Sequence, residues 1–171
     1  KTAAAMLKLD NIVIEDRGVS DKAGQLEFHI PGGGISPGAS FSRRVADRED
    51  CKHQTKEVVT LDDYFPADTP ISVIKVDVEG FELQVFKGAT RILEESSPLL
   101  VFECENRHLV EGTVDDILRF LNASGYDGYF VHRNRLIPAR QFDAAVHQRE
   151  IGERFHADKD YCNNFVLGKI R

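Results

Sequence analysis

The sequence predicts an open α/β sheet, mostly parallel with an antiparallel C-terminal edge, and three observations lead to this fold class. The second half of the chain alternates apolar strands with amphipathic helices, the pattern of parallel strands joined by right-handed crossovers. Two of these strands, Ile71–Val78 and Pro98–Phe102, lead directly into carboxylates. Tyr129–His132 and Leu136–Ile137 flank a short polar turn and therefore predict a hairpin at the edge of the sheet.

Length and composition are those of a single soluble domain. The chain has 171 residues, 42% of them hydrophobic, and residues 1–171 are expected to form one domain. The net charge of −6 argues against a nucleic-acid binder and a basic membrane-surface module. Cys51, Cys104 and Cys162 form no CxxC pair, so free thiols in a reducing cytosol are expected. Because there is no signal peptide and no apolar run of membrane-spanning length, we expect a cytoplasmic protein.

The elements expected in the first half of the chain are short. Lys1–Leu9 has the pattern of the last turns of a helix, and because it lacks an initiator Met, we expect the chain to begin inside a larger domain. A surface loop is expected at Ser40 and Phe41. We also expect a strand at 11–16, a turn at 20–24, a half-exposed strand at 25–30 and a Gly/Pro loop at 31–38. A polar stretch at 43–54, a strand at 57–61 and a helical turn at 62–65 follow.

The second half contains the longer predicted helices. Phe81–Glu95 has apolar residues at helical spacing. Gly88 inside this helix costs about 1 kcal/mol relative to Ala, so we expect it to allow close packing. Thr113 begins another helix, with Asp116 at the capping-box position and Gly125 at its end. The secondary structure of residues 142–155 is ambiguous, with a helix as one possibility, and residues 164–168 predict a closing strand.

Carboxylates gather where the two apolar strands end. Asp77 and Glu79 end the first strand, and Glu103 and Glu105 end the second. Ligands of open α/β sheets bind in the crevice beyond the carboxyl ends of the strands, and neighbouring strands lie about 4.8 Å apart. Side chains alternate between the two faces of a strand, so Asp77 and Glu79 share a face with Lys75. The pattern predicts a site at this edge of the sheet.

Structural roles also account for some of these charges. Acidic residues at a helix N-terminus complement the helix dipole, which explains Glu79 and Glu82 without a function. Lys75 can pair with a carboxylate, since an unpaired buried charge costs several kcal/mol. We favour a structural role for Glu82 and Glu105, and a functional role for the remaining three carboxylates: Asp77, Glu79 and Glu103.

The run ISVIKVDVEGFELQVFKGATRILEESSPLLVFECE, residues 71–105, resembles the FkbM-type methyltransferases. The pattern of that family is an I-K-x-D-x-E-G-x-E strand-to-helix turn, then L-K-G-A, and then a proline-led strand that ends in Glu. Here F-K-G-A stands at Phe86–Ala89. The earlier runs NIVIEDRGVSDKAGQLEFHIP and VVTLDDYF are similar to the same family, so the resemblance covers most of residues 1–108.

This resemblance implies a class I, Rossmann-like fold with S-adenosylmethionine as methyl donor. It further implies O-methylation of a hydroxyl on a small molecule, a glycan or a lipid. Asp77 would take the proton of the substrate hydroxyl as the methyl group transfers, and Glu79 and Glu103 would line the same crevice. Gly18 and Val19 match positions that lie near the adenine of the donor in the family.

The sequence departs from the family in the elements that bind the donor. The first strand of the family carries a D-x-G-A-N-x-G loop for the methionine part of the donor, and the second strand ends in an acid for the ribose; neither is present. The Gly-rich run Gly32–Gly34 is followed by Pro37 rather than by a helix, and we expect a loop there. The chain therefore resembles the C-terminal part of the domain without its first two strands. A strand edge left open in this way predicts self-association.

Two further hypotheses remain open. A divalent-metal-dependent enzyme would use a cluster of Asp77, Glu79, Glu103 and His108, although no HxH or HExxH spacing supports it. A non-catalytic remnant or interaction module would follow from the missing glycine loop. Cys104 has a Glu on either side, which should raise its pKa and make it a poor nucleophile. The other histidines are scattered along the chain: His29, His53, His132, His147 and His156.

Overall fold

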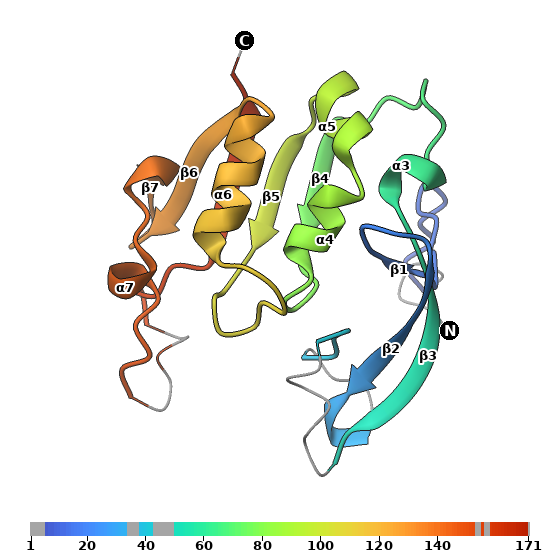
Figure 1. The fold of residues 1–171 in the computed structure, drawn as a ribbon, viewed down its shortest axis with the longest axis horizontal. Coiled ribbons are helices and arrows are strands. Elements are labelled where there is room, and N and C mark those ends of the chain that lie inside the picture. Colours follow the sequence, from blue (N-terminus) through green and yellow to red (C-terminus); the bar gives the residue numbers. More distant parts are fainter. Residues whose placement is uncertain (1–5, 34–37, 43–49, 153–154, 156–157, 171) are drawn as a thin grey trace.

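The structure is a computed structural model that describes residues 6–33, 38–42, 50–152, 155 and 158–170. Most of the expected opening helix, part of the Gly/Pro loop and part of the polar stretch after residue 43 lie outside these residues. The described chain forms two β-sheets, which lie side by side in Figure 1 with short helices around them. None of the described helices has the length and apolar character needed to cross a membrane.

The smaller sheet has the strand order β1-β3-β2. Strand β3 (Lys52–Val59) pairs in parallel with β1 (Gly18–Val19) and antiparallel with β2 (Gly24–Ile30), which confirms the strand expected at residues 25–30. The short 3₁₀ turn η1 (Pro31–Gly33) follows β2. Helix α3 (Leu61–Tyr64) follows β3 and confirms the helical turn expected near residues 62–65.

The larger sheet has the order β4-β5-β8-β6-β7. Its strands are β4 (Val73–Val76), β5 (Leu99–Glu103), β6 (Tyr126–His132), β7 (Arg135–Pro138) and β8 (Asn164–Lys169). As expected, β4 and β5 are parallel neighbours, and β6 and β7 form a hairpin. The expectation of a mostly parallel sheet is wrong, because β8 inserts between β5 and β6 and runs antiparallel to both.

Helices cover one face of the larger sheet. In Figure 1, α4 (Glu82–Lys87), α5 (Thr90–Glu95) and α6 (Val114–Ala123) lie in front of its strands. The buried side chains between these layers form the main core, in which the rings of Phe102 and Phe165 stack across β5 and β8 at 5.1 Å. The helices thus bury one side of β4 and β5.

Helix α6 begins and ends as its sequence predicts. The Thr113 side chain accepts a hydrogen bond from the backbone N–H of Asp116, and the Asp116 carboxylate accepts one from the backbone N–H of Thr113. This reciprocal capping box satisfies two of the N–H groups that a helix leaves without partners at its start. Gly125 follows the helix with a φ of 84°, a left-handed conformation that favours glycine.

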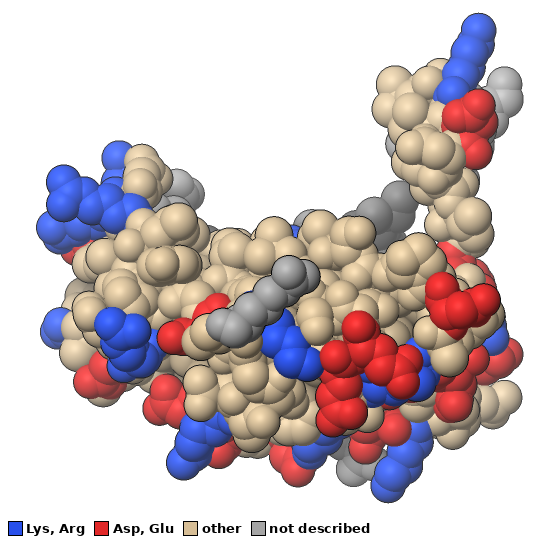
Figure 2. Space-filling view, turned by 90° about the horizontal axis from the view of Figure 1, so that it is seen from above, with Lys and Arg blue, Asp and Glu red and all other residues tan. Residues whose placement is uncertain are grey.

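The opposite face of the larger sheet carries exposed apolar side chains. Val73 on β4, Leu99 on β5 and Tyr129 on β6 are all exposed. Figure 2 views the molecule from above, and the charged side chains gather mainly along the lower border of that view, on the side of the helices. Lys75, which the sequence places on one face of the strand with Asp77, lies on this open face of β4, since Lys75 is exposed while Val76 is buried.

Two predicted elements are wrong for reasons that involve side chains. Asn11–Asp16 forms no strand; the Glu15 carboxylate accepts the backbone N–H groups of Asp16 and Arg17 instead, which competes with sheet pairing. The helix expected over residues 81–95 is two helices, α4 and α5. Asp62, from α3, accepts the backbone N–H groups near the start of α5 at 2.8 and 3.0 Å, and so supplies a cap from a distant part of the chain.

Two more segments differ from expectation in length. Strand β3 begins at Lys52, inside the stretch that the sequence suggested was an irregular polar segment, because it pairs with β2 along the whole length of that strand. In the ambiguous stretch 142–155 the described helix is α7 (Ala144–His147), which is preceded by the 3₁₀ turn η2 (Ala139–Gln141).

The expected close packing at Gly88 is confirmed and can be tested by substitution. A Cβ atom at Gly88 would lie 2.1 Å from the backbone oxygen of Ser20. Gly88 follows the last residue of α4, and overpacking there costs about 1–3 kcal/mol, so Gly88→Ala should lower the free energy of unfolding. Gly38→Ala is the control, because a Cβ there meets nothing within 4 Å. Denaturant unfolding that finds Gly88→Ala as stable as Gly38→Ala would contradict this packing.

Candidate functional site

The turn that follows β4 places two carboxylates at the sheet edge. Asp77 lies beyond the end of the strand, and its half-exposed carboxylate pairs with the Lys75 ammonium at 3.1 Å. This pair confirms the expectation that Lys75 has a carboxylate partner on its own face of the strand. Because about half of each side chain is solvent-exposed, the pair contributes little stability and leaves Asp77 accessible to a ligand.

Glu79 and Gly80 turn the chain through a left-handed conformation. Their φ angles are 53° and 107°. A Cβ at Gly80 would lie 2.1 Å from the backbone oxygen of His108, so only glycine fits. Glu79 is not glycine, and a conformation of this kind typically costs about 1–3 kcal/mol unless the surroundings hold it. Backbone strain of this kind is found mainly at functional sites, which supports the interpretation of this turn as one.

Hydrogen bonds from distant segments hold this turn. The Ser40 hydroxyl donates to the backbone oxygen of Glu79 at 2.7 Å, and the Val110 N–H donates to that of Gly80 at 3.2 Å. The Glu79 carboxylate lies 2.8 Å from Nδ1 of His108, and this hydrogen bond raises the pKa of His108. Ser40 is buried, so its expected position in a plain surface loop is wrong.

The second strand supplies Glu103, which is half-buried at the end of β5. Its carboxylate accepts a hydrogen bond from the Asn163 side chain at 2.7 Å. Burial raises the pKa of Glu103, and the nearby negative charge of Asp77 raises it further. The two strand ends therefore influence each other electrostatically, as expected for carboxylates gathered at one edge.

Glu105 has the structural surroundings that the sequence suggested. It is buried, and its carboxylate accepts hydrogen bonds from Arg107, from Tyr161 at 2.6 Å and from Asn163 at 3.1 Å. Burial alone would raise the pKa of Glu105, but these donors outweigh it and hold that pKa below its usual range. Glu105 thus fastens the segment before β8 to the end of β5.

Glu82 is the residue of this edge that sequence reasoning undervalued. It is 2% exposed; Oε1 accepts the backbone N–H of Gly80 at 3.0 Å, and Oε2 has no hydrogen-bond partner among the described residues. Burial raises the pKa of Glu82, with a smaller contribution from the charge of Glu79. A buried carboxylate without a full set of partners is costly and calls for a functional explanation. Its position at the start of α4, as the last residue of the E-G-x-E pattern, was the available signal.

These groups surround one small cavity at the sheet edge. Its lining consists of Asp77, Glu79, Glu82, Glu103, Cys104, Glu105 and His108, so the predicted gathering of carboxylates from both strands is confirmed. The cavity holds about 10 Å³, roughly the room that one water molecule needs. Cys104 is buried in its wall, and burial, followed by the charges of Glu82 and Glu105, raises the pKa of its thiol, as the flanking glutamates suggested.

Gly18 and Val19 lie at a different place. Val19 lines a mainly apolar cavity of about 430 Å³ together with Val59, Leu61 and Tyr64, and Gly18 lines a neighbouring one. A Cβ at Gly18 would lie 2.4 Å from the ring of Phe41, so glycine is required there for packing. The structure thus separates these two residues from the carboxylate-lined cavity.

The described carboxylates at the sheet edge do not bring their oxygen atoms close enough together for a metal site. Among the described residues, three ligand atoms within 4.8 Å of one another occur at His29, Cys51 and His53, and not at Asp77, Glu79, Glu103 and His108. The hypothesis of a divalent-metal enzyme built on that acidic cluster is therefore not favoured. Cys51, Cys104 and Cys162 are free thiols in the structure.

The chain has a mixed α/β fold with carboxylates beyond the ends of two parallel strands. In open α/β sheets, ligands bind at that edge. The family model of the methyltransferase FkbM domain matches residues 8–127, which is most of the chain. The chain therefore belongs to the FkbM methyltransferase family, as the motifs of residues 71–105 suggested.

A solved structure agrees with this assignment at the level of the fold. The crystal structure of methyltransferase FkbM from Methylobacillus flagellatus KT superimposes with a TM-score of 0.51 at 17% sequence identity. The match covers 98% of this chain and 30% of that chain, so the present chain corresponds to less than a third of the length of that protein. No match is found among curated proteins.

The buried carboxylate of Glu82 predicts a specific pH dependence of stability. Because its pKa is raised in the folded state, the stability that its proton provides is complete below the ordinary Glu pKa and is lost as the pH rises through the raised value. Glu82→Gln should therefore raise the free energy of unfolding by on the order of 1 kcal/mol near neutral pH and by much less near pH 4. Thermal unfolding at both pH values measures this difference, with the exposed Glu94→Gln as control. Equal effects at both pH values would show that the ionisation of Glu82 does not affect the stability of the fold.

Proposed function

We propose that this chain supplies the catalytic edge of an S-adenosylmethionine-dependent O-methyltransferase that acts on a hydroxyl of a small molecule, a glycan or a lipid. The observation that carries the proposal is the carboxylate-lined edge beyond the parallel strands β4 and β5 in a chain of the FkbM family. The family indicates methyl transfer, and carboxylates at this edge are suited to accept a proton from an oxygen nucleophile.

Asp77 is the proposed general base. It stands at the open face of the sheet, half-exposed, and its partner Lys75 comes from the same strand. The donor supplies an electrophilic methyl group on a positively charged sulfur. In that reaction the Asp77 carboxylate would accept the proton that the substrate hydroxyl loses when its oxygen is methylated. The Lys75 ammonium keeps that carboxylate oriented toward the solvent side of the edge.

Glu79 and Glu103 are proposed to shape the charge of the same crevice. Their carboxylates lie in the wall of the cavity with Asp77 and are held by His108 and Asn163 respectively. A concentration of negative charge favours a cationic ligand, so these residues fit the charge of the sulfonium group. For Gly18 and Val19 we propose a role at the adenine, because the apolar cavity beside Val19 suits a flat aromatic base.

The donor site is incomplete within this sequence. The family's glycine-rich loop and its ribose-binding acid are absent from the sequence, and the Gly32–Gly34 run is not a substitute, because its first residues form the 3₁₀ turn η1. We therefore propose that the chain forms the C-terminal part of a single methyltransferase domain, and that turnover requires the loop and the acid from elsewhere in a longer protein.

Asp77→Asn tests the proposed base in a longer protein that contains this chain and the donor loop. Loss of a general base typically lowers the rate about 10²- to 10⁴-fold, whereas the fold should be unaffected because Asp77 is half-exposed. The exposed Asp68→Asn is the matched control. Transfer of a labelled methyl group, together with circular dichroism, measures both properties. Unchanged turnover in Asp77→Asn would remove Asp77 from the reaction.

The isolated chain should bind S-adenosylmethionine weakly. Each lost charged contact is worth about 1.5–3 kcal/mol, and loss of the two donor-binding elements should weaken binding at least about 100-fold. Strand β4 pairs with β5 alone among the described residues, so we also expect the chain to self-associate through the open edge. Calorimetric titration and sedimentation of the same sample test both expectations. Micromolar donor binding by a monomer would show that the cofactor site has been misplaced.

A further inference from the structure

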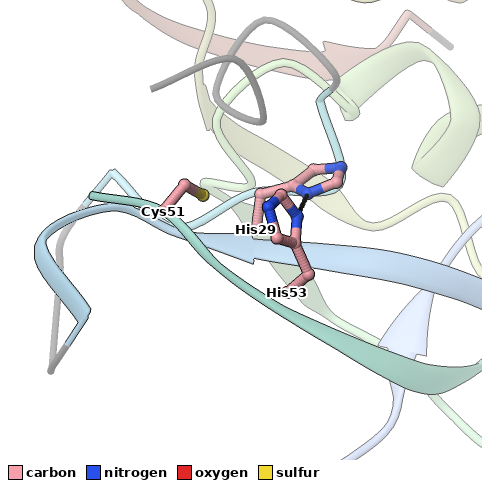
Figure 3. Close-up of side chains that lie close together, drawn as sticks. All are labelled: His29, Cys51 and His53. Atoms are coloured by element: carbon pink, nitrogen blue, oxygen red, sulfur yellow. Dashed lines mark hydrogen bonds between the residues drawn. The ribbon is translucent and has the colours of Figure 1, made fainter. Parts of the chain in front are cut away.

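The β2–β3 hairpin brings two histidines face to face that are far apart in the sequence. His29 on β2 lies directly opposite His53 on β3, and their Nδ1 atoms are 2.9 Å apart (Figure 3). Only one of these two nitrogens can carry a hydrogen in such a contact, because two N–H groups would repel each other. The pair is therefore either a hydrogen bond between two different tautomers or two lone pairs turned toward a shared cation.

Cys51 brings a third ligand to the same place. It stands two residues before His53, directly before the first residue of β3. Figure 3 shows its sulfur directed toward the histidine pair, and one ligand atom from each of the three residues lies within 4.8 Å of the other two. The Cys51 sulfur makes a weak hydrogen bond to the backbone oxygen of Lys52 at 3.7 Å.

The surroundings of the cluster suit a cation. His29 is 1% exposed and gives the site a fixed base, whereas His53 is exposed and Cys51 is half-buried, so an ion can enter from solvent. The Glu27 carboxylate lies 3.9 Å from Nδ1 of His29 and adds negative charge nearby. Tetrahedral Zn²⁺ with Zn–N bonds of about 2.0–2.1 Å separates two ligating nitrogens by roughly 3.3 Å, so a small opening of the pair would admit the ion.

We propose that His29, His53 and Cys51 bind a divalent transition-metal ion of the zinc type. Two imidazoles and one thiolate are ligands that Zn²⁺ favours over Mg²⁺ or Ca²⁺, which take oxygen ligands. A water molecule would complete the four ligands. This site is separate from the carboxylate-lined cavity and does not depend on the proposed methyl transfer.

The ion would stiffen the support of the acidic turn. The backbone of His29 pairs in both directions with Ser40, at 2.8 and 3.0 Å, and the Ser40 hydroxyl donates to the backbone oxygen of Glu79. A metal that bridges β2 and β3 beside the Ile30–Lys52 pair would therefore steady Ser40, which in turn supports the left-handed turn at Glu79. The structure assigns the metal a structural role, so its binding should stabilise the folded chain by mass action.

Titration of the reduced 171-residue chain with Co²⁺, a spectroscopic substitute for Zn²⁺, tests the site. We expect one equivalent to bind, with the visible bands of tetrahedral cobalt and a thiolate charge-transfer band, and Zn²⁺ to displace it. Cys51→Ser should remove the charge-transfer band, and Cys51→Ser and His53→Gln should each weaken binding more than about 10-fold, since even groups that only support a ligand contribute about 10- to 100-fold. His132→Gln, at a half-buried histidine paired with Asp160, should bind like the wild type.

A second measurement needs no variant. Zn²⁺ should slow the alkylation of Cys51 and raise the melting temperature of the wild-type chain, while Cys104 and Cys162, which are buried, serve as internal references. A cobalt complex without the thiolate band would overturn the proposal. So would wild-type affinity in Cys51→Ser, or alkylation of Cys51 at the same rate with and without Zn²⁺; the histidine pair would then be a hydrogen bond and nothing more.

Discussion

The fit of Gly80 against the backbone of His108 is the constraint on which the candidate site depends. A side chain at this position would collide with the His108 carbonyl, so the chain can leave β4 in this direction only through glycine. The same turn places Glu79 in a left-handed conformation and directs the backbone N–H of Gly80 toward the Glu82 carboxylate. Once this turn is fixed, the two strand ends and the start of α4 enclose a common cavity.

Burial and hydrogen bonding shift the pKa values of the carboxylates around that cavity in opposite directions. Burial dominates at Glu82 and Glu103 and raises their pKa values, whereas donors from three residues dominate at Glu105 and lower its pKa. His108 is driven toward its charged form by Glu79. A site with carboxylates in unlike environments can hold protons and negative charge close together, which is the property that acid–base chemistry needs.

The sequence was informative where local rules determine the structure. The alternation along β4 and β5 and the capping box of α6 follow from side-chain geometry within a few residues, and the structure confirms them. Interactions between distant segments could not be inferred from local patterns. The cap that Asp62 provides for α5, the insertion of β8 beside β5 and the bond from Ser40 to Glu79 each join residues more than 25 positions apart. For the same reason the pairing of His29 with His53 was not visible in a linear reading.

The central claim is that methyl transfer occurs at the edge formed by Asp77, Glu79 and Glu103. A crystal structure of a longer protein containing this chain, bound to S-adenosylhomocysteine, tests it most directly. The sulfur of the bound molecule should lie at the mouth of the carboxylate-lined cavity, facing Asp77, with the adenine in the apolar cavity beside Val19. A sulfur atom bound away from this edge, with the carboxylates in contact only with their present protein partners, would contradict the claim.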